Sequence, residues 1–90
     1  MLENTRLFGE AIRKAILSSG CSMNSIALAL EFTSPRTIYR WMNGECLPSF
    51  SNFLSLLRII GPESAGRLVS EITNLPFFIL YSQYIDLKAL

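Results

Sequence analysis

Apolar residues recur every three or four positions along most of the chain, and this spacing is typical of amphipathic helices. The first such segment covers about residues 3–19, where arginine, lysine and glutamate stand between the apolar positions. We expect one helix there, with its apolar stripe facing a core. The stripe consists of Leu7, Phe8, Ala11, Ile12, Ala15 and Ile16.

A second, short helix is predicted to begin after Ser22. Serine is a favoured N-cap residue because its hydroxyl accepts a hydrogen bond from a free backbone N–H of the first turn. Apolar residues follow at positions 26, 27 and 30 and form a narrow stripe. The segment Glu31-Phe32-Thr33 is then expected to form a tight turn.

A third helix is predicted over about residues 35–42. Thr33-Ser34-Pro35 is a strong start signal, since it places a hydroxyl cap before a proline at the first helical position. Asn43-Gly44 is expected to stop the helix, because both residues tolerate positive φ. Its inward face, which packs between other helices, is predicted to comprise Ile38, Trp41 and Met42.

Two further helices are predicted on either side of Gly61-Pro62, the first over residues 50–60 with Ser49 as its cap and the second over about residues 63–75. Their inward positions are predicted to be Phe50, Phe53, Leu54, Leu56, Leu57 and Ile60 in the first helix and Ala65, Leu68, Val69 and Ile72 in the second. Residues 1–75 are therefore expected to form one all-α domain, a compact bundle of about five helices.

The remaining segment, residues 76–90, is hydrophobic and fits two patterns. Its apolar spacing favours a helix, whereas its aromatic and β-branched content favours a strand. Three roles are possible for the segment: it completes the core of the monomer, it packs against a second copy of the chain related by a twofold axis, or it binds another protein. We favour the twofold partner, because the five preceding helices already supply a core. The residues expected to mediate dimerisation are Phe77, Leu80, Tyr81 and Tyr84.

Composition limits the classes of function. Half of the 90 residues are apolar, the mean hydropathy is +0.35, and the net charge is +1. There is no histidine, and Cys21 and Cys46 are isolated, so we predict no metal site, no cofactor and no disulfide framework. The sequence also has no paired-carboxylate motif and no glycine-rich phosphate motif. We therefore do not expect an enzyme.

The same residues bear on localisation. Charged residues throughout the N-terminal segment argue against a signal peptide. The longest apolar stretch, residues 75–81, is too short for a bilayer span, which needs about 20 residues. The tail lacks the basic polar face of helices that attach to membranes. We expect a cytoplasmic protein with reduced thiols and no membrane contact.

The second and third predicted helices, joined by a tight turn, match a helix-turn-helix, in which the second helix enters the major groove of DNA. Arg36 and Arg40 lie one turn apart on the outer face of that helix, and arginine forms bidentate hydrogen bonds with guanine O6 and N7. Thr37 can contact a base or a phosphate, and Tyr39 a phosphate. No acidic residue lies between positions 32 and 44, so the local charge favours DNA although the total charge does not.

The starts of the predicted helices are further candidates, since free backbone N–H groups at a helix N-terminus bind phosphate oxygens. This reasoning adds Ser22 and Ser34 to the candidate DNA contacts, with Ser49 as another helix start. Asn43, in the loop after the third helix, is also a candidate, although its first role is to stop that helix.

Residues 20–61 resemble the phage-repressor and Cro-like, or XRE-type, helix-turn-helix family. The resemblance rests on the run Ser34-Pro35-Arg36-Thr37-Ile38-Tyr39-Arg40-Trp41-Met42-Asn43-Gly44, followed by Leu47-Pro48-Ser49. It implies a lambda-repressor-like fold of four or five helices, binding to a DNA operator, and a symmetric dimer.

Two residues and the length of the turn depart from the family pattern. Met23 stands where the family often has glutamine, and Asn24 is the expected substitute for its contact with DNA. Glu31 stands where the turn usually has glycine, and an acid there lies near the DNA backbone and weakens binding. The turn is also one residue longer than usual, which changes the expected crossing of the two helices.

The sequence therefore predicts a transcriptional regulator, a homodimeric repressor that binds double-stranded DNA and takes no small-molecule ligand. The alternative is a protein-interaction module, an antitoxin or adaptor that retains the helix-turn-helix fold and binds a partner through its tail. Substituting Arg36 and Arg40 separates the two, because only a DNA reader depends on them.

Overall fold

Five helices make up the computed structural model, which describes residues 2–74 and their side chains from Thr5 onward. The helices are α1 (Leu2–Ser19), α2 (Met23–Ala29), α3 (Arg36–Met42), α4 (Phe50–Ile60) and α5 (Pro62–Ile72). No strand occurs among the described residues, so the prediction of an all-α domain with five helices is confirmed. The predicted dimerisation segment, with Phe77, Leu80, Tyr81 and Tyr84, lies outside the described residues.

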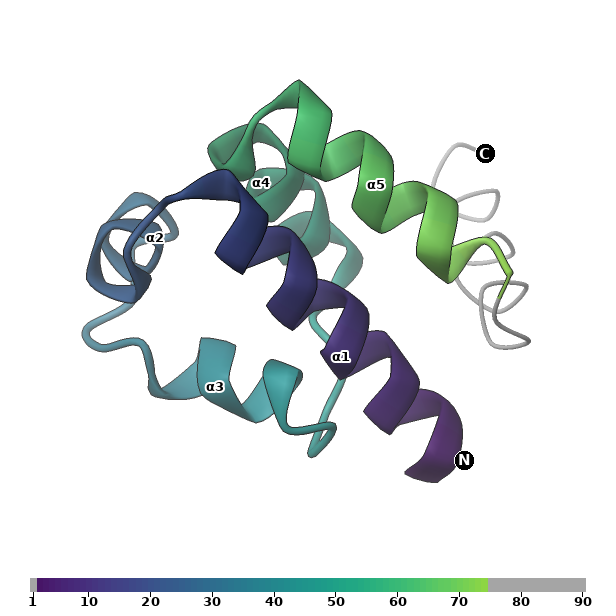
Figure 1. Ribbon diagram of the computed structural model, residues 1–90. Coiled ribbons are helices and arrows are strands. Elements are labelled where there is room, and N and C mark those ends of the chain that lie inside the picture. The colour runs from purple at the N-terminus through teal and green to yellow at the C-terminus, as the bar shows by residue number, and fades with distance from the viewer. Residues whose placement is uncertain (1, 75–90) are drawn as a thin grey trace, which may run out of the picture.

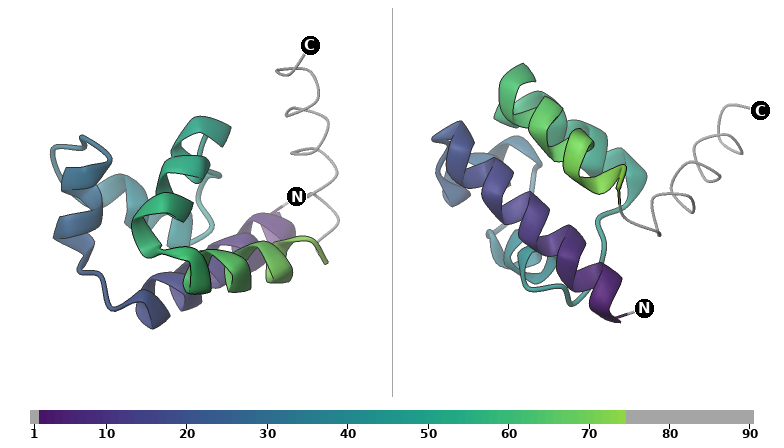
Figure 2. Two further views of the ribbon diagram at one scale, coloured as in Figure 1. Left: turned by 90° about the horizontal axis from the view of Figure 1, so that it is seen from above. Right: turned by 45° about the vertical axis from the view of Figure 1, so that its right-hand side comes forward.

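Helix α1 is the central element of the fold. It packs against both α3 and α5, which lie on opposite sides of it (Figure 1). Helix α4 packs against α5 and also contacts α1 and α2, so that it closes the side of the molecule behind α1 (Figures 1 and 2). None of the helices in the described part of the chain is both long and apolar enough to cross a membrane.

The core is built from one stripe of each helix. All but one of the residues predicted for the stripe of α1 are buried, and the exception, Leu7, is half-buried. Trp41 is only 2% exposed, as predicted, and its ring meets the ring of Phe32 edge-on at 5.9 Å. The rings of Phe8 and Phe53 lie 5.7 Å apart and join α1 to α4. The recognition-helix candidate α3 is thereby fixed to the core along its apolar face.

Two residues predicted to face inward do not do so. Leu54 in α4 and Val69 in α5 are 39% and 36% exposed. Each helix buries a single narrow stripe, at Phe53, Leu56 and Ile60 in α4, and the apolar residues beside that stripe stay at the surface. In α5 the buried stripe instead includes Ser64, whose Oγ lies 2.9 Å from the Oγ of Ser18 in α1.

Helices α2 and α3 end in the same backbone motif. After α2, the N–H of Glu31 donates to the carbonyl of Leu28, and the N–H of Phe32 donates to that of Ala27. After α3, the N–H of Gly44 donates to the carbonyl of Trp41, and the N–H of Glu45 donates to that of Arg40. Both are Schellman motifs, which need a residue in the left-handed region after the cap. Gly44 occupies that position with φ of 76°, and Glu31 occupies it with φ of 63°.

Glu31→Gly is expected to stabilise the fold by about 1 kcal/mol. Relief of the left-handed conformation contributes roughly 1–2 kcal/mol, and the greater conformational entropy of glycine in the unfolded state offsets part of it. For a domain of this size, that gain raises the melting temperature by about 4–8 °C in a thermal unfolding experiment. Glu31→Ala is the control, because it removes the same carboxylate but keeps the Cβ. A glycine variant no more stable than the alanine variant would contradict strain at this position.

Candidate nucleic-acid interface

Helix α3 separates its apolar and polar residues as the sequence predicts. Ile38, Trp41 and Met42 are buried, Thr37 is half-buried, and the remaining candidates are exposed. The exposed face consists of Arg36, Tyr39 and Arg40. Arg36 and Arg40 are four residues apart, so they share a side of the helix. The structure therefore places two guanidinium groups and a phenol on one accessible surface of a helix that is fixed by its other side.

The start of α3 differs from the prediction by one residue. Pro35 is the N-cap rather than the first helical residue, with ψ of 8°, and its carbonyl accepts a hydrogen bond from the N–H of Tyr39 at 3.1 Å. A ψ near zero lies outside the helical region, which is why the helix begins at Arg36. Ser34 is therefore not the cap, and its Oγ accepts a hydrogen bond from the N–H of Arg36 at 3.4 Å.

The two arginines of this face differ in their surroundings. Arg36 makes no ion pair with any residue in the described part of the chain. The Nε of Arg40 lies 3.7 Å from the Oε1 of Glu45, and both side chains are more than half exposed. An ion pair this exposed contributes little to stability. It nevertheless places a carboxylate beside the exposed face of α3, although residues 32–44 themselves include no acidic residue. Sequence reasoning missed it because Glu45 stands just outside that stretch.

The candidates at the start of α2 are used in different ways. Ser22 is the N-cap as predicted: its Oγ accepts a hydrogen bond from the N–H of Ser25 at 3.0 Å and donates to the Oγ of Ser25 at 2.8 Å. Its hydroxyl is thus engaged within the protein. The side chain of Asn24 is exposed and makes no hydrogen bond to another described residue.

Asn43 connects the end of α3 to α1. Its backbone caps the helix, and its side-chain Oδ1 accepts a hydrogen bond from the Nη2 of Arg13 at 3.0 Å. Sequence reasoning treats Arg13 only as one of the charged residues between the apolar positions of the first helix and gives it no role. No local pattern reveals this contact, because the two residues are 30 positions apart and meet only through the packing of α3 on α1.

A groove of about 510 Å³ lies beside this contact. Arg13, Ser22 and Tyr39 bring polar groups to it from α1, the start of α2 and α3, and no acidic residue lines it. Its remaining walls are mainly apolar and include Leu17, Met23 and Met42. The groove therefore extends the exposed face of α3 toward α1 without adding negative charge.

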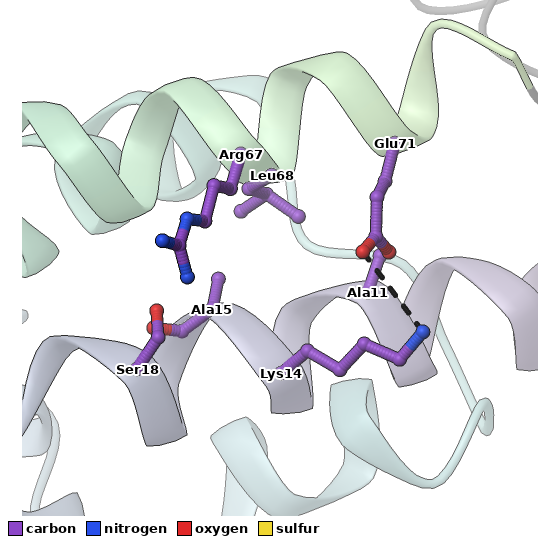
Figure 3. A pocket seen from close by; sticks show the side chains of 7 residues that line it. All are labelled: Ala11, Lys14, Ala15, Ser18, Arg67, Leu68 and Glu71. Carbon is purple, nitrogen blue, oxygen red and sulfur yellow. Dashed lines mark hydrogen bonds and ion pairs between the residues drawn. The ribbon is translucent and has the colours of Figure 1, made fainter.

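A second hollow, of about 160 Å³, lies on the other side of α1, against α5. Figure 3 shows Lys14 of α1 directed toward Glu71 of α5, with an Nζ to Oε1 distance of 3.9 Å. Arg67, which also lines this hollow, has its Nη2 3.4 Å from the Oε1 of Glu63. Both cations here are balanced by carboxylates, so this hollow offers no net positive charge to a ligand.

Gly9 sets how closely α1 approaches α3, and sequence reasoning missed it. A Cβ at this position would lie 2.4 Å from the carbonyl oxygen of Trp41 and 2.7 Å from that of Met42. The end of α3 therefore rests directly on the backbone of α1. The one available signal is a glycine inside an otherwise regular helical pattern, which often marks close packing.

The described residues contain no group of three histidine, cysteine, aspartate or glutamate side chains placed to hold a metal ion. Cys21 and Cys46 are both free thiols and half-buried, and the Sγ of Cys21 lies 3.8 Å from the carbonyl oxygen of Ile59. The arginine face of α3 is thus the main concentration of candidate groups.

Comparison of the chain with protein-family models, with curated proteins and with solved structures gives no match. Membership of the XRE-type family therefore stays a prediction from the sequence motif.

Proposed function

We propose that the protein is a sequence-specific regulator of transcription that binds double-stranded DNA. In this proposal α2 and α3 form a helix-turn-helix of the repressor and Cro-like type, and α3 lies in the major groove. The observation that carries it is the division of α3 into a buried face around Trp41 and an exposed face with Arg36 and Arg40. A helix of this kind can enter a groove with its cations while the domain holds it from behind.

The fixed position of α3 supports the proposal. Reading base edges requires side chains held to within about 0.5 Å of their working geometry, which a rigid element provides better than a loop. Helix α3 is anchored on its inner face by Ile38 and Trp41, and its end rests on α1 at Gly9. Gly44 closes the helix with a Schellman motif.

The side chains of α3 have separate roles in this proposal. Arg36, at the first turn and without an ion pair among the described residues, is the first candidate for bidentate hydrogen bonds to guanine. Arg40 is the second candidate, and its ion pair with Glu45 has to break before its guanidinium can bind DNA. Tyr39 and Asn43 contact phosphates, and Asn24 does so from α2.

A dimer completes the proposed mechanism. We propose that residues 76–90 join two copies, so that two α3 helices enter successive major grooves about 34–36 Å apart on a near-palindromic operator. A dimer bound in this way blocks access of RNA polymerase to the site, which is the action of a repressor.

Arg36→Ala is expected to weaken binding to duplexes enriched by the wild-type protein from a random pool by about 1–3 kcal/mol, because it removes a base-reading group. Folding stability stays unchanged, since the side chain is exposed. The matched control is Arg67→Ala, which removes the same charge from α5, on the opposite side of α1 from α3 (Figure 1). Equal affinities of the two variants, measured by fluorescence anisotropy, would refute the assigned role of α3.

A second candidate function is a protein-interaction module, such as an antitoxin or adaptor. It is favoured by two exposed leucines near the proposed interface, Leu17 at 75% and Leu28 at 78% exposure, which a protein partner would cover. Under this alternative, Arg36→Ala leaves partner binding intact and no duplex is enriched.

A further inference from the structure

Arg13 and Lys14 are adjacent cations on α1, and the sequence gives no reason to treat them differently. The fold separates them. Lys14 is directed toward α5, where its Nζ lies 3.9 Å from the carboxylate of Glu71 (Figure 3). Arg13 is directed toward α3, where its Nη2 donates to the Oδ1 of Asn43 at 3.0 Å. One cation is therefore paired with an acid, and the other is paired with a neutral amide at the end of the proposed recognition helix.

The hydrogen bond between Arg13 and Asn43 leaves donors free on both residues. A guanidinium has five N–H donors, and Arg13 uses one of them on Asn43 among the described residues. Asn43 accepts that bond through its Oδ1, and its amide nitrogen donates to no other residue in the described part of the chain. Both side chains are exposed. Together they form a pair of donors that is held in place before any ligand arrives.

The surroundings of this pair match a phosphate in charge. No acidic residue lines the groove beside Arg13, and Tyr39 of α3 lines the same groove. Tyr39 also belongs to the exposed face with Arg36 and Arg40. The Arg13–Asn43 pair therefore continues that face toward α1, outside the part of α3 that would lie within the groove of DNA.

We propose that Arg13, held by Asn43, binds a phosphate of the DNA backbone beside the major groove and so fixes the position of α3 along the duplex. This inference rests on the proposed function. Contacts of this kind carry no sequence information, but they set the register and orientation in which the base-reading side chains meet the duplex.

The test compares Arg13→Gln with Lys14→Gln. Both substitutions remove one positive charge from neighbouring exposed positions of one helix, so long-range electrostatics change equally. Arg13→Gln is expected to weaken binding about tenfold for enriched and random duplexes alike, as loss of a charge-assisted hydrogen bond does. The slope of log affinity against log salt falls by about 0.9, the value for one phosphate contact. Lys14→Gln keeps the wild-type affinity and slope, and Arg13→Lys restores the slope.

The possible outcomes distinguish the role of Arg13 from the proposed function as a whole. Equal affinities and salt slopes for Arg13→Gln and Lys14→Gln, together with a loss of binding for Arg36→Ala, would overturn the role of Arg13 and leave the proposed function standing. A wild-type protein that binds no duplex would overturn both. Thermal unfolding of each variant, followed by circular dichroism, verifies that both exposed substitutions leave the fold intact.

Discussion

Trp41→Ala is expected to lower the free energy of unfolding by about 3–5 kcal/mol, the usual loss when a large aromatic side chain is removed from a core. Trp41 is 2% exposed, and its ring meets Phe32 at 5.9 Å. It thus joins α3 to the turn that precedes the helix. Since domains of this kind have a total stability of about 5–15 kcal/mol, the variant loses a large part of it.

Urea unfolding followed by far-ultraviolet circular dichroism measures this loss, because Trp41 is the only tryptophan and its fluorescence disappears with it. Tyr39→Ala is the control: the neighbouring aromatic residue is 45% exposed, and its removal is expected to change stability by less than about 0.5 kcal/mol. If the two variants unfold at the same urea concentration, the inner and outer faces of α3 are assigned wrongly.

The second large effect is expected from Gly9→Ala. In an open helix, replacing glycine with alanine stabilises by up to about 1 kcal/mol. At Gly9 the new Cβ meets the carbonyl oxygens of Trp41 and Met42 at 2.4 and 2.7 Å, so α1 and α3 have to move apart. The expected result is a destabilisation of about 1–3 kcal/mol, as for other overpacked cores. The sign of the effect is therefore opposite to that given by helix propensity.

Gly66→Ala provides a matched control for this prediction. Gly66 lies in α5, and a Cβ there meets no atom within 4 Å. This variant is expected to gain stability, by up to about 1 kcal/mol, from helix propensity alone. Chemical unfolding of both variants gives the comparison. A gain of stability at Gly9 as well would show that α3 does not rest on the backbone of α1.

Local signals in the sequence account for most helix boundaries. Ser22 and Ser49 cap α2 and α4 as predicted, because capping depends only on residues within one turn. The inward residues of α1 and α3 follow from their spacing. Leu54 and Val69 are not predicted correctly, because periodicity shows which positions are apolar, whereas the packing of the helices against one another decides which of them are covered.

The candidate site is predictable only in part. The exposed arginines of α3 follow from the apolar pattern of one helix, and the departure at Glu31 is visible as an acid where glycine is usual. The contact of Arg13 with Asn43 and the approach of Gly9 to α3 depend on how α1 crosses α3, which joins residues some thirty positions apart. A short stretch of sequence therefore cannot reveal how the two helices cross.

The measurement that tests the central claim most directly is binding of the purified full chain to a pool of random DNA duplexes at two salt concentrations, with sequencing of the retained DNA. A dimeric reader that uses α3 predicts enrichment of an inverted repeat, with half-sites about one helical turn apart or a multiple of it, and affinity that falls steeply as salt rises. Absence of enrichment, with no binding even at low salt, would contradict the account.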